Sequence, residues 1–104
     1  MAPRLTVRST VRATSLDVAL AGELDMTAAF RLESELERLI SSPGIDGVVL
    51  DLAEVSFLDS AGLGALLSIR EQATRVGRDL RIDRMSEPVR RILDATATRS
   101  VFGG

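Results

Sequence analysis

The stretch GVVLDLAEVSFLDSAGLGALL, residues 47–67, decides the fold because it joins an apolar strand to a helix. Its first part, residues 47–52, is short, β-branched and almost wholly apolar, which is typical of a central strand covered on both faces. Beyond Asp59 the apolar residues recur at helical spacing, so we predict a helix over residues 60–76 with Gly77 as its C-cap.

Two glycines interrupt the first turns of that predicted helix. Gly62 and Gly64 are separated by a single residue, and a glycine inside a helix costs roughly 1 kcal/mol relative to alanine. Their closeness indicates that something must approach the backbone at this point.

The segment before this stretch has the pattern of a hairpin followed by a helix. Residues 4–11 and 15–21 alternate polar and apolar side chains and predict two strands joined by a tight turn. Residues 27–41 place apolar side chains on one face and charged ones opposite, which predicts an amphipathic helix. The SPG motif at 42–44 ends it.

The segment after the stretch adds another strand and another helix. DLRIDRM at 79–85 predicts a strand, Pro88 opens a third helix, and the tail to Gly104 has room for one last short strand. The predicted fold class is therefore α/β, a small mixed β-sheet with crossover helices in the order β-β-α-β-α-β-α and an optional final strand. Residues 1–104 are expected to form a single domain.

The order of elements brings two segments together in space. If the strand at 15–21 runs parallel to the strand at 47–52, both right-handed crossovers leave from the same edge of the sheet. GELDMT at 22–27 and FLDSAGLG at 57–64 then become neighbours, at the edge where ligands of α/β sheets tend to bind.

The composition excludes much chemistry. The 104 residues include no Cys, His, Trp, Tyr or Lys, and all 13 basic residues are Arg. A Ser-His-Asp triad, a thiol nucleophile, the usual zinc ligands and a phosphate-loop lysine are thus all absent. We predict that the protein is not an enzyme, has no catalytic residue, and needs no metal or cofactor.

Charge is spread unevenly but mildly. Residues 1–67 carry 5 Arg and 10 acids, and residues 68–104 carry 8 Arg and 5 acids, so the two halves differ in sign. This is too weak for a nucleic-acid footprint, and Phe is the only aromatic residue available for stacking on bases. The N-terminus has no signal-peptide or membrane-span pattern, so we expect a cytoplasmic protein without direct membrane insertion.

Three motifs together resemble the STAS-domain family, and within it the single-domain anti-sigma-factor antagonists of bacteria. They are GELDMT at 22–27, VVLDLAEVSFLDSAGLGALL at 48–67 and PVRRIL at 88–93, and the resemblance covers nearly the whole chain. The C-terminal DATATRSVFGG departs from the family pattern, in which a glycine and a hydrophobic residue usually follow the third helix.

The resemblance implies a phosphorylation cycle at Ser60. The unphosphorylated antagonist binds an anti-sigma factor and frees a sigma factor. The anti-sigma factor, which is itself a serine kinase, switches the antagonist off with ATP, and a phosphatase restores it. Such a protein would be a cytoplasmic phosphoprotein that acts by partner switching in transcription regulation.

The residues at this helix start allow two interpretations each. Ser60 is either an N-cap whose hydroxyl accepts from the N–H of Gly62 or Leu63, or a switch whose phosphate meets a helix N-terminus. Asp25 and Asp59 are either helix caps or part of a partner interface beside Ser60.

Apolar residues near Ser60 leave a similar choice. Leu63 and Leu67 either pack inward or form an exposed patch that docks the partner, and Phe30 raises the same question on the first helix. We predict that the partner-binding residues are Asp25, Thr27, Asp59, Ala61, Gly62, Leu63 and Leu67.

Two other functions compete with the switch. STAS domains also serve as small subunits of membrane lipid-transport ATPase complexes, without a phosphorylation cycle. An enzyme such as a nucleotide hydrolase is the second alternative, although GLGALLS lacks the Lys of a Walker loop and the glycine spacing of a dinucleotide site.

Overall fold

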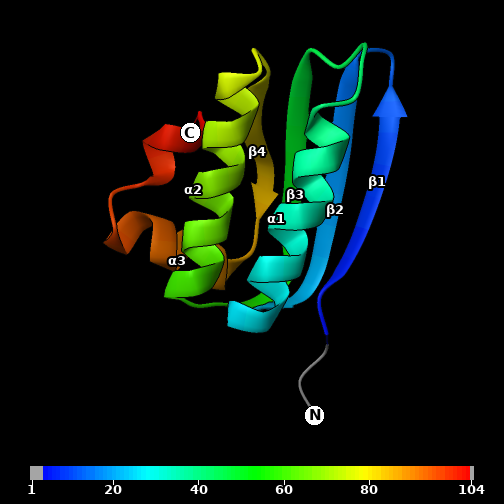
Figure 1. The fold of residues 1–104 in the computed structure, drawn as a ribbon. Helices are drawn as coiled ribbons and strands as arrows, with labels where there is room; N and C mark the ends of the chain where they lie inside the picture. The colour runs from blue at the N-terminus through cyan, green and yellow to red at the C-terminus, as the bar shows by residue number, and fades with distance from the viewer. Residues whose placement is uncertain (1–3, 104) are drawn as a thin grey trace.

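The computed structural model describes residues 4–103, and its elements follow the predicted order (Figure 1). The strands are β1 (Thr6–Arg12), β2 (Ser15–Leu24), β3 (Gly47–Leu58) and β4 (Asp79–Met85), and the helices are α1 (Met26–Ile40), α2 (Ser60–Arg75) and α3 (Glu87–Ala95). A short 3-10 helix, η1 (Arg99–Phe102), follows α3.

The sheet is mixed, as the sequence predicts. Its strands lie in the order β1-β2-β3-β4, with β1 antiparallel to β2 and the other two pairings parallel. The expected parallel pairing of β2 with β3 is confirmed, and it places both crossover helices on one face of the sheet (Figure 1).

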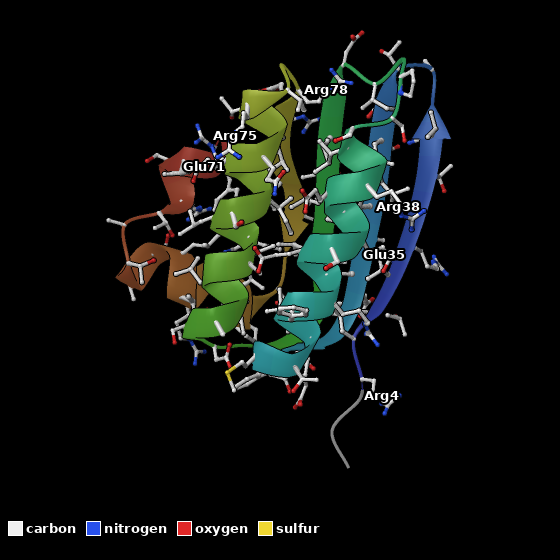
Figure 2. All side chains as sticks on the ribbon, viewed as in Figure 1. Arg4, Glu35, Arg38, Glu71, Arg75 and Arg78 are labelled. Atoms are coloured by element: carbon white, nitrogen blue, oxygen red, sulfur yellow. The ribbon has the colours of Figure 1, made fainter. Side chains whose placement is uncertain are left out.

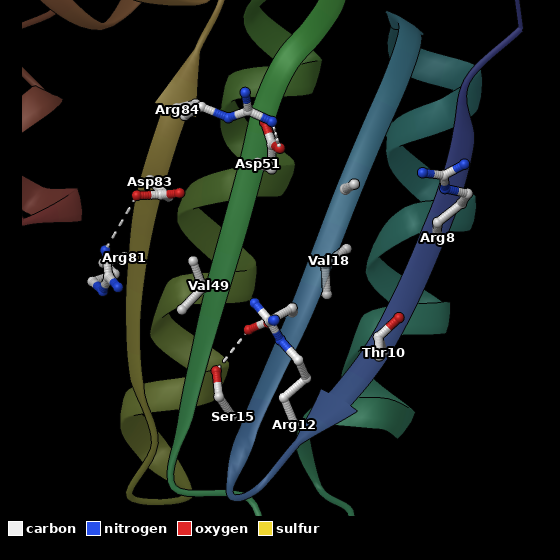
Figure 3. A pocket seen from close by; sticks show the side chains of 12 residues that line it. Arg8, Thr10, Arg12, Ser15, Val18, Val49, Asp51, Arg81, Asp83 and Arg84 are labelled. Atoms are coloured by element: carbon white, nitrogen blue, oxygen red, sulfur yellow. Dashed lines mark hydrogen bonds and ion pairs between the residues drawn. The ribbon is translucent and has the colours of Figure 1, made fainter.

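The core lies between that face and the helices. Alternate residues of β3 point into it, since Val48, Leu50 and Leu52 are buried while Val49 and Asp51 are only half-buried. The prediction that this strand is covered on both faces is wrong, because α1 and α2 both lie on the same side and the opposite face is open (Figure 3).

Strand β3 also runs six residues beyond the predicted end at residue 52. It does so because β2 extends with it to Leu24, and two irregularities in their pairing keep the strands bonded along the whole length. An irregular ladder breaks the simple alternation of side chains, so periodicity alone ends the strand too early.

The predicted final strand is wrong, because η1 occupies that part of the chain. The Thr96 hydroxyl donates to the Ile92 carbonyl at 2.8 Å, and the N–H of Thr98 donates to the Leu93 carbonyl at 3.0 Å. These bonds turn the chain back at the end of α3. They bring Phe102 into the core, where its side chain is 1% exposed.

Candidate functional site

Two strand ends and two helix starts meet at one edge of the sheet. Leu24 at the end of β2 pairs with Leu58 at the end of β3, and an aspartate follows each leucine. Helices α1 and α2 begin directly after these aspartates and lie side by side (Figure 1). The expectation that residues 22–27 and 57–64 are neighbours is therefore confirmed.

The two aspartates cap the two helices in the same way. The N–H of Ala28 donates to Asp25 Oδ1 at 3.0 Å, and the N–H of Gly62 donates to Asp59 Oδ1 at 2.8 Å. Both aspartates have extended backbones, as N-cap residues do. The capping interpretation is thus confirmed for both aspartates.

The interpretation of Ser60 as the N-cap is wrong, because Asp59 already occupies that position. Both N–H groups that the serine hydroxyl was expected to bond are taken: Gly62 donates to the Asp59 carboxylate, and Leu63 donates to the Asp59 carbonyl at 2.9 Å. Ser60 is instead the first residue of α2 and is exposed. Its hydroxyl has no side-chain hydrogen bond within residues 4–103.

The two glycines have different surroundings. A Cβ on Gly62 would lie 2.2 Å from the Leu24 carbonyl oxygen and 2.7 Å from Leu58 Cδ1, so only glycine allows α2 to begin this close to the end of β2. A Cβ on Gly64 would have no heavy atom within 4 Å apart from its chain neighbours and the backbone of its own helix. Gly62 therefore explains the expected close backbone approach, and Gly64 does not.

The other predicted partner-binding residues divide by exposure. Thr27 is exposed, Asp25, Asp59, Ala61 and Leu67 are half-buried, and Gly62 and Leu63 are buried. Leu63 is only 9% exposed and belongs to the core, so its inward-packing interpretation is confirmed and the exposed-patch interpretation is wrong for it. Leu67 packs against the same core with part of its surface outside.

Large apolar side chains do lie exposed near this edge, on other residues. Phe30 is 79% exposed, Met26 is 72% exposed and Phe57 is 43% exposed. The sequence pattern does not single out Met26, because only the Asp25 cap identifies it as the first residue of α1. Nor does the pattern reveal the exposure of Phe57, because the irregular pairing at Gly22/Glu23 breaks the alternation of side chains along the strand.

A hollow of about 400 Å³ lies between the start of β1 and the start of α1. Its lining is Arg4, Leu5, Glu23, Asp25, Thr27, Ala28 and Arg31. Arg31 donates to the Leu5 carbonyl at 2.9 Å, and Figure 2 places Arg4 on the far side of α1 from α2. This hollow borders Asp25 and Thr27 without reaching Ser60.

A wider hollow of about 730 Å³ lies on the open face of the sheet, lined by residues of all four strands (Figure 3). Arg84 donates to Asp51 at 2.5 Å, and Arg12 donates to Asp17 at 2.9 Å. A third pair, Arg81 with Asp83, is 3.7 Å apart. Most of the charged side chains that line this hollow are therefore paired with a side chain of opposite charge.

These contacts change the acidity of two aspartates. Desolvation acts to raise the pKa of Asp51, but the hydrogen bonds from Arg84 and from the Ala53 N–H outweigh it and lower that pKa. The Ser15 hydroxyl and then Arg12 lower the pKa of Asp17. Both aspartates are therefore held as carboxylates, so neither is suited to act as a proton donor.

Two kinds of feature are absent from residues 4–103. No group of three or more acidic side chains there is arranged to hold a metal ion. None of the helices in that part of the chain is both long enough and apolar enough to cross a membrane.

The chain was compared with known proteins. A family model described as STAS domain matches residues 3–102. The "Anti-sigma F factor antagonist" of Paenibacillus polymyxa is 30% identical over 79 residues, which cover 76% of this chain and 68% of that protein.

Solved structures of anti-sigma factor antagonists share the fold of this chain. An anti-sigma factor antagonist from Mycobacterium paratuberculosis has a TM-score of 0.83 at 24% identity, covering 95% of this chain and 83% of the other. SpoIIAA in its unphosphorylated form has a TM-score of 0.74 at 20% identity, covering 93% and 84%. In its phosphorylated form it has a TM-score of 0.66 at 18% identity, covering 95% and 87%.

Proposed function

The chain belongs to the STAS domain family, and on this premise we propose that it is an anti-sigma factor antagonist switched by phosphorylation of Ser60. The name of the Paenibacillus polymyxa relative supports the antagonist function. The existence of a phosphorylated form of SpoIIAA, whose fold this chain shares, supports a switch of this kind. The exchange of partners takes place in the cytoplasm under this proposal.

The observation that carries the proposal is the free hydroxyl of Ser60. Asp59 caps α2, so Ser60 can be modified without breaking a bond that holds the helix start. Ser60 is also exposed, on a rigid element beside the start of a second helix.

The reaction transfers one phosphoryl group from ATP held by the anti-sigma factor kinase. Ser60 Oγ attacks the γ-phosphorus, a new O–P bond forms, and the bond from that phosphorus to the β,γ-bridging oxygen breaks. ADP leaves, and the hydroxyl proton passes to a base of the kinase. The kinase supplies these groups because this chain has no His, Lys or Cys.

The phosphate changes binding by its charge. It adds about −1.5 to −2 charges at the N-terminus of α2, where the helix dipole tolerates an anion. An acidic group on the partner then meets like charge, and about 2.7 kcal/mol of repulsion weakens binding 100-fold. A phosphatase reverses the change.

The partner surface surrounds Ser60 in this proposal. Its accessible part comprises the exposed Thr27 and four half-buried residues, Asp25, Asp59, Ala61 and Leu67. Gly62 and Leu63 contribute from beneath, because their packing fixes the position of the first turn of α2.

The direct test is incubation with ATP-Mg²⁺ and each purified anti-sigma factor kinase of the host, followed by intact-mass measurement and peptide mapping. We expect one phosphate, located on Ser60. Ser60→Ala should stay unmodified, and Thr74→Ala, which removes an exposed hydroxyl at the far end of α2 and outside the proposed partner surface, should be modified like the unchanged protein.

Binding provides the second readout. Ser60→Ala should bind the kinase constitutively and Ser60→Asp should bind about 100-fold more weakly. Equal affinities of the two variants, or no modification by any kinase that binds, would contradict the switch. Binding to a lipid-transport ATPase without modification would support the alternative role as a transport subunit.

A further inference from the structure

Gly64 lies inside a helix, where glycine is unfavourable, and no packing contact requires a glycine at this position. It lies inside α2, four residues after Ser60, and it is exposed. Glycine is among the least favourable residues in a helix interior, and here a Cβ would meet no heavy atom within 4 Å apart from its chain neighbours and the backbone of its own helix. Gly62, in contrast, is required by the Leu24 carbonyl.

The helix geometry relates Gly64 to Ser60. Residues four apart lie on the same helix face, and the Cα–Cβ bond tilts toward the helix N-terminus. Any side chain at position 64 would therefore extend over the preceding turn, toward Ser60. With glycine there, the space above the serine stays open on that side.

The start of α1 shows the opposite arrangement at equivalent positions. Met26 is the first residue of α1 as Ser60 is of α2, and Phe30 follows Met26 by the same four residues. Both are largely exposed. Of two adjacent helix starts with the same type of cap, one carries two large apolar side chains and the other carries a serine and a glycine at the equivalent positions.

We propose that Gly64 is a specificity-determining residue that keeps open the space a kinase active site needs in order to reach Ser60. This inference rests on the proposed phosphorylation of Ser60. Phosphoryl transfer requires the γ-phosphorus of ATP to come within about 3–3.5 Å of Ser60 Oγ along one line. Ser60 is held on a helix and cannot extend toward the enzyme, so the enzyme must surround it in place.

The clearance can be measured without a kinase. The chain has no cysteine, so Ser60→Cys creates a single thiol at the position of interest. Its rates of reaction with iodoacetamide and with a maleimide on a bulky polymer are compared in the presence and absence of Gly64→Leu. Thr74→Leu, which adds the same side chain near the far end of α2, is the matched control.

We expect Gly64→Leu to slow the bulky reagent about tenfold more than the small one, because only the bulky reagent needs the open approach. Thr74→Leu should change neither rate. An equal effect of Gly64→Leu on both reagents, or no effect on either, would overturn the inference whatever the kinase does.

The role in recognition is tested with Ser60 intact. Gly64→Ala should raise the Tm by about 4 °C, because alanine favours the helix. Phosphorylation by the anti-sigma factor kinase should fall in kcat/KM by about tenfold for Gly64→Ala and by more for Gly64→Leu. A purely structural role of Gly64 would lower the Tm instead.

The two proposals fail separately. If the kinase modifies the unchanged protein and Gly64→Leu at the same rate, the inference about Gly64 is wrong and the switch stands. If no kinase modifies the unchanged protein, the phosphorylation proposal fails, and the thiol rates still report the clearance.

Discussion

The two strand–helix units of the protein, β2–α1 and β3–α2, are built on one plan. Leu-Asp-x-Ala stands at residues 16–19 and again at 50–53, and Leu-Asp stands at 24–25 and again at 58–59. The second copy of each motif follows the first by 34 residues. The strand ends pair, and the final aspartate of each unit caps its helix.

The units differ in the first turn of the helix. Large apolar side chains project from α1, whereas the equivalent positions of α2 hold Ser60 and Gly64. Beneath them, Ala28 of the first unit corresponds to Gly62 of the second. The two units thus share the capped strand end and differ in the residues that directly follow the cap.

The largest difference between the units should appear at the position that packs against the strand. Gly62→Ala should reduce the free energy of unfolding by about 3 kcal/mol, because the new Cβ meets the Leu24 carbonyl and the backbone must move. The reverse change at the equivalent place, Ala28→Gly, should cost only about 1 kcal/mol. Urea denaturation measures both.

Similar losses in the free energy of unfolding for these two variants would show that α2 can accept a Cβ at position 62 as α1 does at position 28. The distinction drawn between a required and a dispensable glycine would then be wrong.

The caps should behave alike, since their geometry is nearly the same. Asp25→Ala and Asp59→Ala should each lower the free energy of unfolding by about 1 kcal/mol, the usual contribution of a side-chain N-cap. The same denaturation experiment tests this, with Asp→Asn at each position as the conservative control. A much larger loss at one cap would break the symmetry of the two units.

The aspartates of the two Leu-Asp-x-Ala motifs should make the stability of the protein depend on pH in the acid range. Asp17 and Asp51 both have a lowered pKa in the folded protein. Their contribution to stability is therefore present above the unfolded-state pKa of about 4 and is lost as the pH falls through the folded value. Asp51→Asn should make the loss of stability below about pH 4 shallower than in the unchanged protein.

Thermal denaturation between about pH 6 and pH 2 measures this slope. The effect should be smaller than that of a cap, because the Arg84–Asp51 pair is partly exposed to solvent. A slope unchanged by both Asp17→Asn and Asp51→Asn would show that the arginine contacts on the open face do not persist in solution.

The smallest effect is expected at Ser60. Ser60→Ala should change the free energy of unfolding by less than about 0.5 kcal/mol, because Asp59 and not Ser60 caps the helix. Met26→Ala is the matched change at the first residue of α1 and should be as mild. A loss near 1 kcal/mol for Ser60→Ala alone would show that its hydroxyl does help to cap α2.

Much of the fold follows from the sequence because periodicity is a strong local signal. The alternation in residues 15–21 and the helical spacing in residues 27–41 predict β2 and α1 with small errors at their ends. The right-handed crossover rule then correctly brings the two helix starts together. These predictions depend on properties that each segment carries by itself.

The remaining features depend on contacts between segments. The length of β3 depends on irregular pairing with β2, and the turn that replaces the last strand depends on hydrogen bonds back to α3. Two candidate caps stand next to each other at 59 and 60, and only the backbone conformation decides between them. The different reasons for Gly62 and Gly64 likewise appear only when the surroundings of each are known.

The order of the sheet has a consequence for the behaviour of many molecules together. Strands β1 and β4 lie at the two borders, where a second molecule could add a strand and begin an aggregate. Arginines stand on both borders, Arg8 and Arg12 on β1 and Arg81 and Arg84 on β4. Three of these arginines, Arg12, Arg81 and Arg84, are also paired with aspartates. A strand added at either border would have to accommodate these charged side chains, which opposes edge-to-edge aggregation.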